Sequence, residues 1–139
     1  MRASWVLVAM PLVLAACGGI VDAPSPLPPE QAAFVFRVHG RPPTEEFRIV
    51  SSSPAFVAEA RAQLALPEAA RKRFPSGPIA AGNGGVNLSW GWHFEDASFT
   101  DATIELCDGS PSLVQVNLDY WLNTVKRFCP WGGYVYVER

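Results

Sequence analysis

The sequence predicts an α+β fold in which a small antiparallel sheet carries about two amphipathic helices on one face. Short β-rich runs alternate apolar and polar residues, which is typical of strands with one covered face. Two dipeptides, Ser53-Pro54 and Ser110-Pro111, precede stretches whose apolar residues recur at helical spacing. Two cysteines, Cys107 and Cys129, are available for one disulfide. Hairpins interspersed with only two substantial helices favour the α+β class.

The first elements form a predicted hairpin followed by a helix. Residues Phe34–Val38 are rich in β-formers, and Gly40 with the prolines at 42 and 43 marks a turn before a second short strand at Phe47–Val50. The helix begins after Ser53 and carries an apolar stripe made of Phe56, Val57, Ala60 and Leu64. Pro67 ends or kinks it, and the basic residues 71–73 are placed near the end of a second short turn.

A loose segment separates this part from the next strands. Residues 71–86 are rich in Gly and Pro, and Gly82–Gly85 is predicted to be a flexible loop. Alternation in Trp90–Glu95 then predicts a strand with three aromatic rings on one face and His93 with Glu95 on the other. A further strand is expected from about Phe99 to Cys107, with one apolar and one polar face.

The C-terminal part is predicted to be a second helix and a last strand. The helix begins after Ser110 and ends near Lys126, and its apolar stripe consists of Val114, Leu118, Trp121, Leu122 and Val125. The strand covers Tyr134–Val137 and completes the chain.

The N-terminus resembles a bacterial lipoprotein signal. Arg2 precedes a short apolar run that ends in Leu14-Ala15-Ala16, and Cys17 follows directly. Cleavage before Cys17 leaves a first residue that carries a thioether-linked diacylglycerol and an amide-linked acyl chain. The alternative is a transmembrane anchor, but the stretch is shorter than the ~20 apolar residues needed to span a bilayer and Pro11 interrupts it.

The sequence therefore divides into three parts. Residues 1–16 are the predicted signal peptide, residues 17–32 are the lipidated cysteine and a Pro-rich linker, and residues 33–139 are one globular domain. Prolines stiffen the linker toward polyproline II, at about 3.1 Å per residue, so it acts as a spacer. The expected location is the bacterial cell envelope. Gly18, in place of an aspartate, permits transfer to the outer membrane in a cell that has two.

Charge and cysteine content narrow the possible partners. The formal net charge is −2, and without Arg2 the mature chain has −3, which does not favour nucleic acid as a partner.

In an exported protein Cys107 and Cys129 are expected to form a disulfide that stabilises the fold by about 3 kcal/mol. The alternative, a metal or redox pair, would require a C-x-x-C or a neighbouring histidine, and the sequence contains neither. We expect no metal and no cofactor.

Several segments together resemble a known family. They are Phe34–Phe36, Ala58–Arg61, Trp90–His93, Ile104–Asp108, Pro111–Val114 and Cys129–Trp131. The likeness is to small secreted bacterial domains that are labelled after a eukaryotic calmodulin-binding protein containing the same module. Its most specific part is the pair of Cys-Asp and Cys-Pro-Trp elements, and residues 71–86 depart from the pattern. A calmodulin-type target helix in residues 54–74 is the weaker interpretation, because Pro67 interrupts it.

Catalytic signals are sparse. His93 and Glu95 alternate onto one strand face about 7 Å apart, within reach of a hydrogen bond, and are weak candidates for an acid/base pair. The plain interpretation is a strand histidine held by a neighbouring carboxylate for packing. The alternative function is accordingly a small envelope hydrolase that uses His93 with a nearby carboxylate.

Aromatic content provides the remaining clue to function. Trp131, in a turn beside a disulfide cysteine, and one ring of Tyr134 and Tyr136 are the expected surface aromatics. The leading hypothesis is a lipid-anchored, non-enzymatic binding module whose partner is a protein or a glycan, held on the membrane by its lipid. A third possibility is an inhibitor-like structural lipoprotein that blocks another protein with its disulfide-stapled region.

Overall fold

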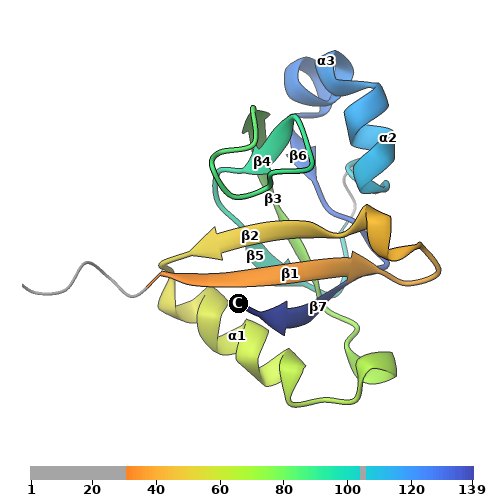
Figure 1. Cartoon of the computed structure of the whole chain (residues 1–139). Coiled ribbons are helices and arrows are strands. Elements are labelled where there is room, and N and C mark those ends of the chain that lie inside the picture. The colour runs from red at the N-terminus through yellow and green to blue at the C-terminus, as the bar shows by residue number, and fades with distance from the viewer. Residues whose placement is uncertain (1–30, 104–105) are drawn as a thin grey trace, which may run out of the picture.

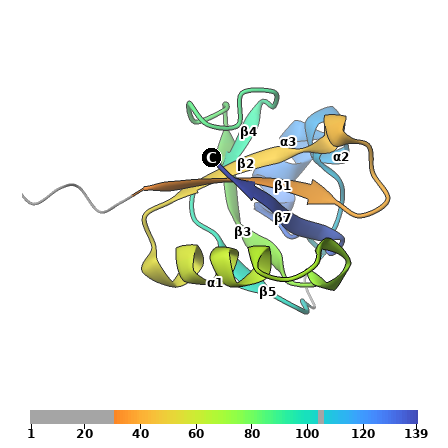
Figure 2. The same cartoon turned by 60° about the horizontal axis from the view of Figure 1, so that its bottom comes forward.

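The computed structural model describes residues 31–103 and 106–139, and it has the predicted α+β architecture (Figures 1 and 2). The predicted signal peptide, Cys17 and the linker up to residue 30 lie outside the described residues. The strands are β1 (Ala32–Val38), β2 (Phe47–Ser51), β3 (Phe74–Ala81), β4 (Trp92–Phe94), β5 (Ser98–Thr100), β6 (Arg127–Phe128) and β7 (Gly133–Glu138). The helical segments are η1 (Pro43–Glu45), α1 (Pro54–Leu64), η2 (Glu68–Ala70), α2 (Pro111–Val116), α3 (Leu118–Tyr120) and η3 (Trp121–Val125). Among the residues described, no helix has the length and apolarity to cross a membrane.

The first sheet contains the predicted hairpin and the predicted last strand. Its order is β2-β1-β7, and both pairings are antiparallel. The register shifts between Val35, which pairs with Val137, and Phe36, which pairs with Val135, so Tyr136 is the extra residue of a β-bulge. Alternate residues of β1 point into the core, where Phe34 and Phe36 are fully buried.

The second sheet is built on β3, a strand inside the Gly- and Pro-rich segment 71–86, for which the sequence predicted no strand. β3 pairs antiparallel with β4, β5 and β6, each through a short stretch. The sequence of β3 does not indicate a strand, because it contains two prolines and Gly77. Proline cannot donate a hydrogen bond to a ladder, and proline and glycine both normally mark turns. Gly77 is required for close approach, since a β-carbon there would collide with the carbonyl oxygen of Asp96. The loop prediction holds for Gly82–Gly85.

Both predicted helix starts are confirmed. The Ser53 hydroxyl accepts a hydrogen bond from the Phe56 amide at 3.4 Å, and the Ser110 hydroxyl accepts one from the Leu113 amide at 3.3 Å. In each case proline occupies the first turn of the helix. α1 covers the inner face of the first sheet (Figure 2), where Phe56 packs against Phe34 with ring centroids 6.1 Å apart.

Two predicted elements are shorter or more broken than expected. The second helix is not continuous, because Asn117 has φ −122° and ψ 37°, and Trp121–Val125 is wound as a π-helix. It ends at Lys126, which adopts the left-handed conformation with φ 63°. The strand expected from Phe99 to Cys107 is only β5 at Ser98–Thr100, and residues 104–105 lie outside the described residues.

The core between the sheets and helices is largely aromatic. The aromatic side chains of the Trp90–Glu95 segment pack into it as predicted: Trp92 is fully buried, and Trp90 and Phe94 are partly buried against the same cluster. Trp92 and Phe128 make an edge-to-face contact at 5.1 Å. Close packing of such large rings leaves little freedom for the surrounding backbone, so the core positions the loops described next.

Candidate functional site

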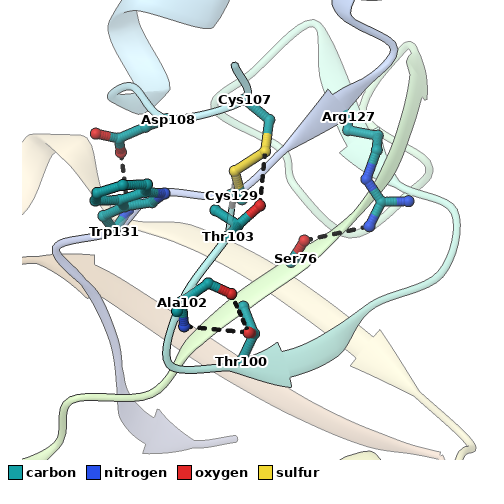
Figure 3. The surroundings of a disulfide bond; sticks show 9 residues. All are labelled: Ser76, Thr100, Ala102, Thr103, Cys107, Asp108, Arg127, Cys129 and Trp131. Carbon is teal, nitrogen blue, oxygen red and sulfur yellow. Dashed lines mark hydrogen bonds between the residues drawn. A yellow bond between two sulfur atoms is a disulfide. The ribbon is translucent and has the colours of Figure 1, made fainter. Parts of the chain in front are cut away.

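A disulfide joins the two elements that carried the family resemblance. Cys107 and Cys129 are bonded as predicted, with their Cα atoms 5.2 Å apart, and both side chains are buried (Figure 3). The Cys129 amide also donates a 2.9 Å hydrogen bond to the Cys107 carbonyl. The Cys107-Asp108 segment and the turn at Cys129–Trp131 are thus held side by side by the disulfide and by a backbone hydrogen bond.

Hydrogen bonds on both sides of Trp131 fix its backbone. The Trp131 amide donates to the Asp108 carboxylate at 2.9 Å (Figure 3). On the following residues, the Gly133 amide donates to the Pro130 carbonyl at 2.7 Å and the His39 amide donates to the Gly132 carbonyl at 2.8 Å. The Trp131 side chain is 52% exposed, in agreement with the prediction that it lies at the surface. The Trp131 ring is therefore exposed to solvent, while the backbone that carries it is fixed by hydrogen bonds.

Other exposed apolar side chains accompany Trp131. Leu106, next to Cys107, is 95% exposed. Leu113 and Val116 are exposed three residues apart on α2, which places them on one face of that helix, and Tyr120 is exposed on α3. We call the set Leu106, Leu113, Val116, Tyr120 and Trp131 the Trp131 surface. The exposed members on α2 and α3 were not predicted, although Leu113, Val116 and Tyr120 are apolar residues outside the predicted buried stripe.

Two contacts hold α2 beside the braced turn. A β-carbon at Gly109 would come within 3.2 Å of the Leu113 side chain and 3.1 Å of the Trp121 ring, so glycine permits the close approach. The buried Glu45 carboxylate accepts hydrogen bonds from the Ser112 amide at 3.1 Å and from the Ser112 hydroxyl at 2.5 Å. An anion at a helix N-terminus is favourable because it satisfies free amides. The helix is thereby fixed to η1 and the first sheet.

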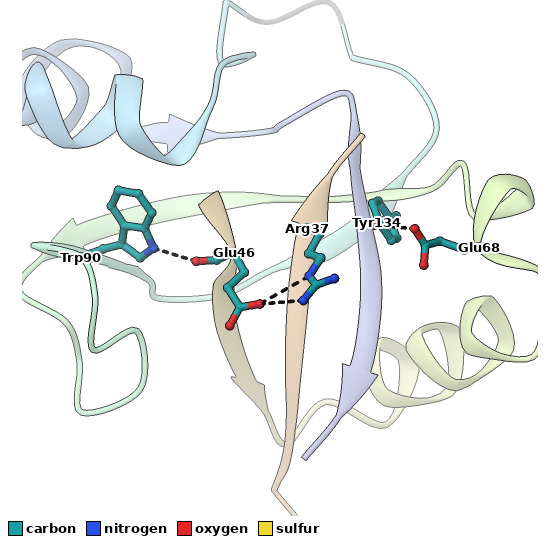
Figure 4. Close-up of polar contacts among 5 residues, drawn as sticks. All are labelled: Arg37, Glu46, Glu68, Trp90 and Tyr134. Carbon is teal, nitrogen blue, oxygen red and sulfur yellow. Dashed lines mark hydrogen bonds and ion pairs between the residues drawn. The ribbon is translucent and has the colours of Figure 1, made fainter. Parts of the chain in front are cut away.

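Tyr134, the second aromatic candidate, is engaged within the fold. Its hydroxyl donates a hydrogen bond to the Glu68 carboxylate at 2.8 Å (Figure 4). Its side chain is only 5% exposed, and its ring stacks on the His39 ring with centroids 4.1 Å apart. Desolvation by burial and the hydrogen bond to the Glu68 carboxylate raise the pKa of Tyr134 to about 12. The phenol therefore stays neutral and acts as a donor that ties η2 to β7.

Tyr136, the third candidate, is half-buried and covered on one face. The Arg37 guanidinium carbon lies 3.5 Å from the centre of its ring, a cation-π contact. Arg37 also forms a 3.4 Å ion pair with Glu46, whose carbonyl accepts a hydrogen bond from the Trp90 indole at 2.9 Å (Figure 4). The β-bulge thus places the Tyr136 ring under the Arg37 side chain, on the outer face of the first sheet. Of the three aromatic candidates, Trp131 has the most accessible ring.

His93 and Glu95 share a strand face, but the described residues give them separate surroundings. The His93 ring lies against Gly84, whose φ of +62° only glycine adopts easily, and its Nδ1 is 2.8 Å from the Gly82 carbonyl. No hydrogen bond between the His93 and Glu95 side chains occurs in the part of the chain described. An acid/base pair at these positions remains a prediction. In residues 31–103 and 106–139, no three His, Cys, Asp or Glu side chains gather to form a metal site.

Comparison with known proteins identifies the family of the folded part. The model that matches residues 30–139 describes the BP-74 N-terminal domain, and the match includes the whole domain predicted at 33–139. No curated protein and no solved structure is significantly similar to the chain. The match spans both sheets, the disulfide and the Trp131 surface, and it agrees with the resemblance seen in the sequence. The chain belongs to the BP-74 N-terminal domain family.

Proposed function

We propose that this protein is a binding module of the bacterial cell envelope, held on a membrane by lipid on Cys17, and that the Trp131 surface contacts a protein partner. The observation that carries the proposal is Trp131, a half-exposed indole on a turn fixed by a disulfide and hydrogen bonds on both sides. The brace stabilises the fold, and it also presents the exposed ring in one fixed position.

The rigidity of the turn supports a role in binding. Association is opposed by the entropy lost when loops and side chains are ordered, about 0.5–1.5 kcal/mol for each rotamer-rich side chain. The Trp131 backbone is already ordered, so the loop part of this cost has been met during folding. Tryptophan is also among the residue types that dominate binding energy in protein interfaces.

The neighbouring side chains favour a protein partner over a glycan. Leu106 and Leu113 are aliphatic and exposed, and the segment from Cys107 to Gly109 holds them near the turn that carries Trp131. Interface cores are apolar and depleted in charge, and exposed apolar patches of this kind mark contact sites. Asp108, a charged group beside Trp131, already accepts a hydrogen bond from the Trp131 backbone.

The tether and the Trp131 surface lie at opposite ends of β1. The chain enters β1 at Ala32, whereas the Trp131 turn is bonded to His39, just after the other end of that strand. A strand of this length spans about 20 Å. A lipid-anchored linker that joins at Ala32 therefore leaves the Trp131 surface directed away from the anchor, toward a partner that approaches from the far side.

Photo-crosslinking in intact cells tests the proposal. A photoreactive phenylalanine analogue is placed at Trp131, at Val116, or at the control position Ala69, which is exposed on η2 at a different part of the surface. We expect one and the same protein to be crosslinked from Trp131 and Val116 and not from Ala69. Crosslinking that is absent at both surface positions, or equal at Ala69, would contradict the proposal.

The lipid on Cys17 is tested separately by the intact mass of the protein purified from bacterial membranes. We expect a chain that begins at Cys17 with two or three acyl chains, since stable anchoring needs more than one. An unmodified chain that retains residues 1–16 would contradict the anchoring without affecting the Trp131 surface.

A further inference from the structure

The edge strand β2 has backbone groups that point out of the first sheet. In an antiparallel pair, residues alternately bond to the partner strand and face away from it. The Arg48 amide faces away from β1, because it donates to the Asn87 side chain at 3.0 Å. The Ala33 carbonyl, opposite Val50, accepts a bond from Arg139 on the other side of β1 at 2.8 Å. By alternation, the amide and carbonyl of Val50 also point outward.

The edge strand β4 presents the same arrangement from the second sheet. The Glu95 amide donates to the Pro78 carbonyl of β3 at 3.0 Å, and the Gly91 carbonyl accepts from Gly82 at 2.8 Å, so odd-numbered residues face β3. The Trp92 carbonyl faces the opposite way and accepts a bond from the Asn87 side chain at 2.9 Å. The amide and carbonyl of Phe94 therefore point out of the second sheet.

Asn87 bridges the two edges in the way a peptide group would. Its side chain is 2% exposed, its Oδ1 accepts from Arg48 of β2, and its Nδ2 donates to Trp92 of β4. A strand placed between two edges makes the same pair of bonds, one to each side. β4 lies on the β2 side of the first sheet in both views, away from β7 (Figures 1 and 2). Asn87 thus closes one end of a gap between the sheets.

Beyond Asn87 the gap is open. Two cavities of ≈ 290 and ≈ 370 Å³ lie there, and Ile49, Val50 and Phe94 line both. We call this continuous space the β2–β4 groove. In the described part of the chain, the outward amide and carbonyl groups of Val50 and Phe94 have no hydrogen-bond partner. An open edge with unpaired backbone groups is a template for another strand.

We propose that the β2–β4 groove binds an extended peptide segment of another protein, which pairs with Val50 on one side and Phe94 on the other. Arg48 of β2 and Trp92 of β4 both bond to the Asn87 side chain. The next residues that face the groove are Val50 and Phe94, two positions further along each strand, so β2 and β4 run in the same direction. The peptide is then parallel to both strands or antiparallel to both. Strand addition of this kind takes its affinity from main-chain hydrogen bonds and its specificity from alternate side chains.

The charges at the groove define the preferred peptide. Glu95 and Asp96 line the wider cavity, and both side chains are exposed, so a Lys or Arg at that end of the peptide is favoured. The chain's own linker suits the groove poorly, because prolines at 24, 26, 28 and 29 cannot donate to a ladder. The proposal does not depend on the Trp131 surface, which lies on other elements.

The test uses a pool of hexapeptides, acetyl-X-Val-Lys-Val-X-Val-amide, with X randomised, added to the full-length ¹⁵N-labelled chain in detergent micelles. Amide hydrogen exchange is followed by NMR. We expect the Val50 and Phe94 amides to become protected at least about tenfold, while those of Ile49 and His93, which already face their own sheets, do not change. A matched pool that is N-methylated at alternate residues cannot form the ladder and should give no protection.

Charge reversal provides the second measurement. Glu95→Lys should weaken binding of the Lys pool about two- to fivefold, the range of an exposed ion pair, and Asp119→Lys on α3 should leave it unchanged. The proposal is overturned if Val50 and Phe94 gain no protection, or if the N-methylated pool protects them equally. It is also overturned if both amides are protected before peptide is added, because the chain itself would then fill the groove.

Discussion

The Trp131 amide donates a 2.9 Å hydrogen bond to the carboxylate of Asp108, 23 residues earlier in the sequence. The bond lies beside the Cys107–Cys129 disulfide, and the two links together fix the turn that presents the indole ring. A side chain thus acts together with backbone hydrogen bonds to set the position of the most accessible aromatic candidate.

Removing that carboxylate should loosen the turn. Asp108→Ala is expected to lower the free energy of unfolding by about 1 kcal/mol, because an exposed backbone amide loses its partner. The melting temperature should fall by about 4 °C. Asp119→Ala, an exposed acid on α3, is the control and should have little effect. Equal melting temperatures for Asp108→Ala and the native protein would show that the bond does not hold the turn.

Loss of the disulfide should have a larger effect. Cys107 and Cys129 are 22 residues apart, and closing a loop of that length stabilises a fold by about 3 kcal/mol. We expect the double variant Cys107→Ser, Cys129→Ser to show this loss in chemical denaturation, and dithiothreitol to have the same effect on the native protein only. If reductant destabilised the double variant as well, the stabilisation would have another source.

Asn87 should be one of the most sensitive polar positions. Asn87→Ala leaves the Arg48 amide and the Trp92 carbonyl without partners at a buried site, so we expect a loss of about 2–4 kcal/mol in the free energy of unfolding. Asn83→Ala is the matched control, because Asn83 is exposed and its side chain accepts a bond only from Gly85 in its own turn. A loss below about 0.5 kcal/mol at Asn87 would contradict its bridging role.

Tyr134 should make stability depend on alkaline pH. Its pKa is raised from 10.0 to about 12 in the folded protein, so the folded state retains the phenol proton more tightly than the unfolded state does. The stabilisation is complete below pH 10 and is lost as the pH rises toward 12. Unfolding experiments between pH 9 and 12 should show a steeper loss for the native protein than for Tyr134→Phe, which cannot titrate. Parallel curves would show that Tyr134 is not linked to folding.

The sequence was informative where local chemistry decides structure. Ser53 and Ser110 cap helices because the side-chain oxygen of each reaches a free amide of the first turn. The Ser-Pro dipeptide that marks each helix start can be read directly from the sequence. The alternation of Trp92 and Phe94 correctly indicated a core-facing side. The disulfide followed from the number of cysteines remaining after Cys17.

Tertiary context determined what the sequence did not disclose. β3 contains Pro75, Gly77 and Pro78, and it is a strand only because three short partners pair with different parts of it. The break at Asn117 likewise has no strong local signal, since apolar spacing continues through it. The exposed face of α2 and the bridge at Asn87 depend on contacts between segments far apart in the sequence, so periodicity alone does not predict them.

The most direct test of the Trp131 surface is the affinity of the photo-crosslinked partner for the native protein and for Trp131→Ala, measured by calorimetry together with the thermal stability of each. Truncating a central aromatic anchor should cost about 2 kcal/mol, or roughly thirtyfold in affinity, with a melting temperature close to that of the native protein. An unchanged affinity would contradict the proposed contact, and a large loss of stability would assign Trp131 to the core.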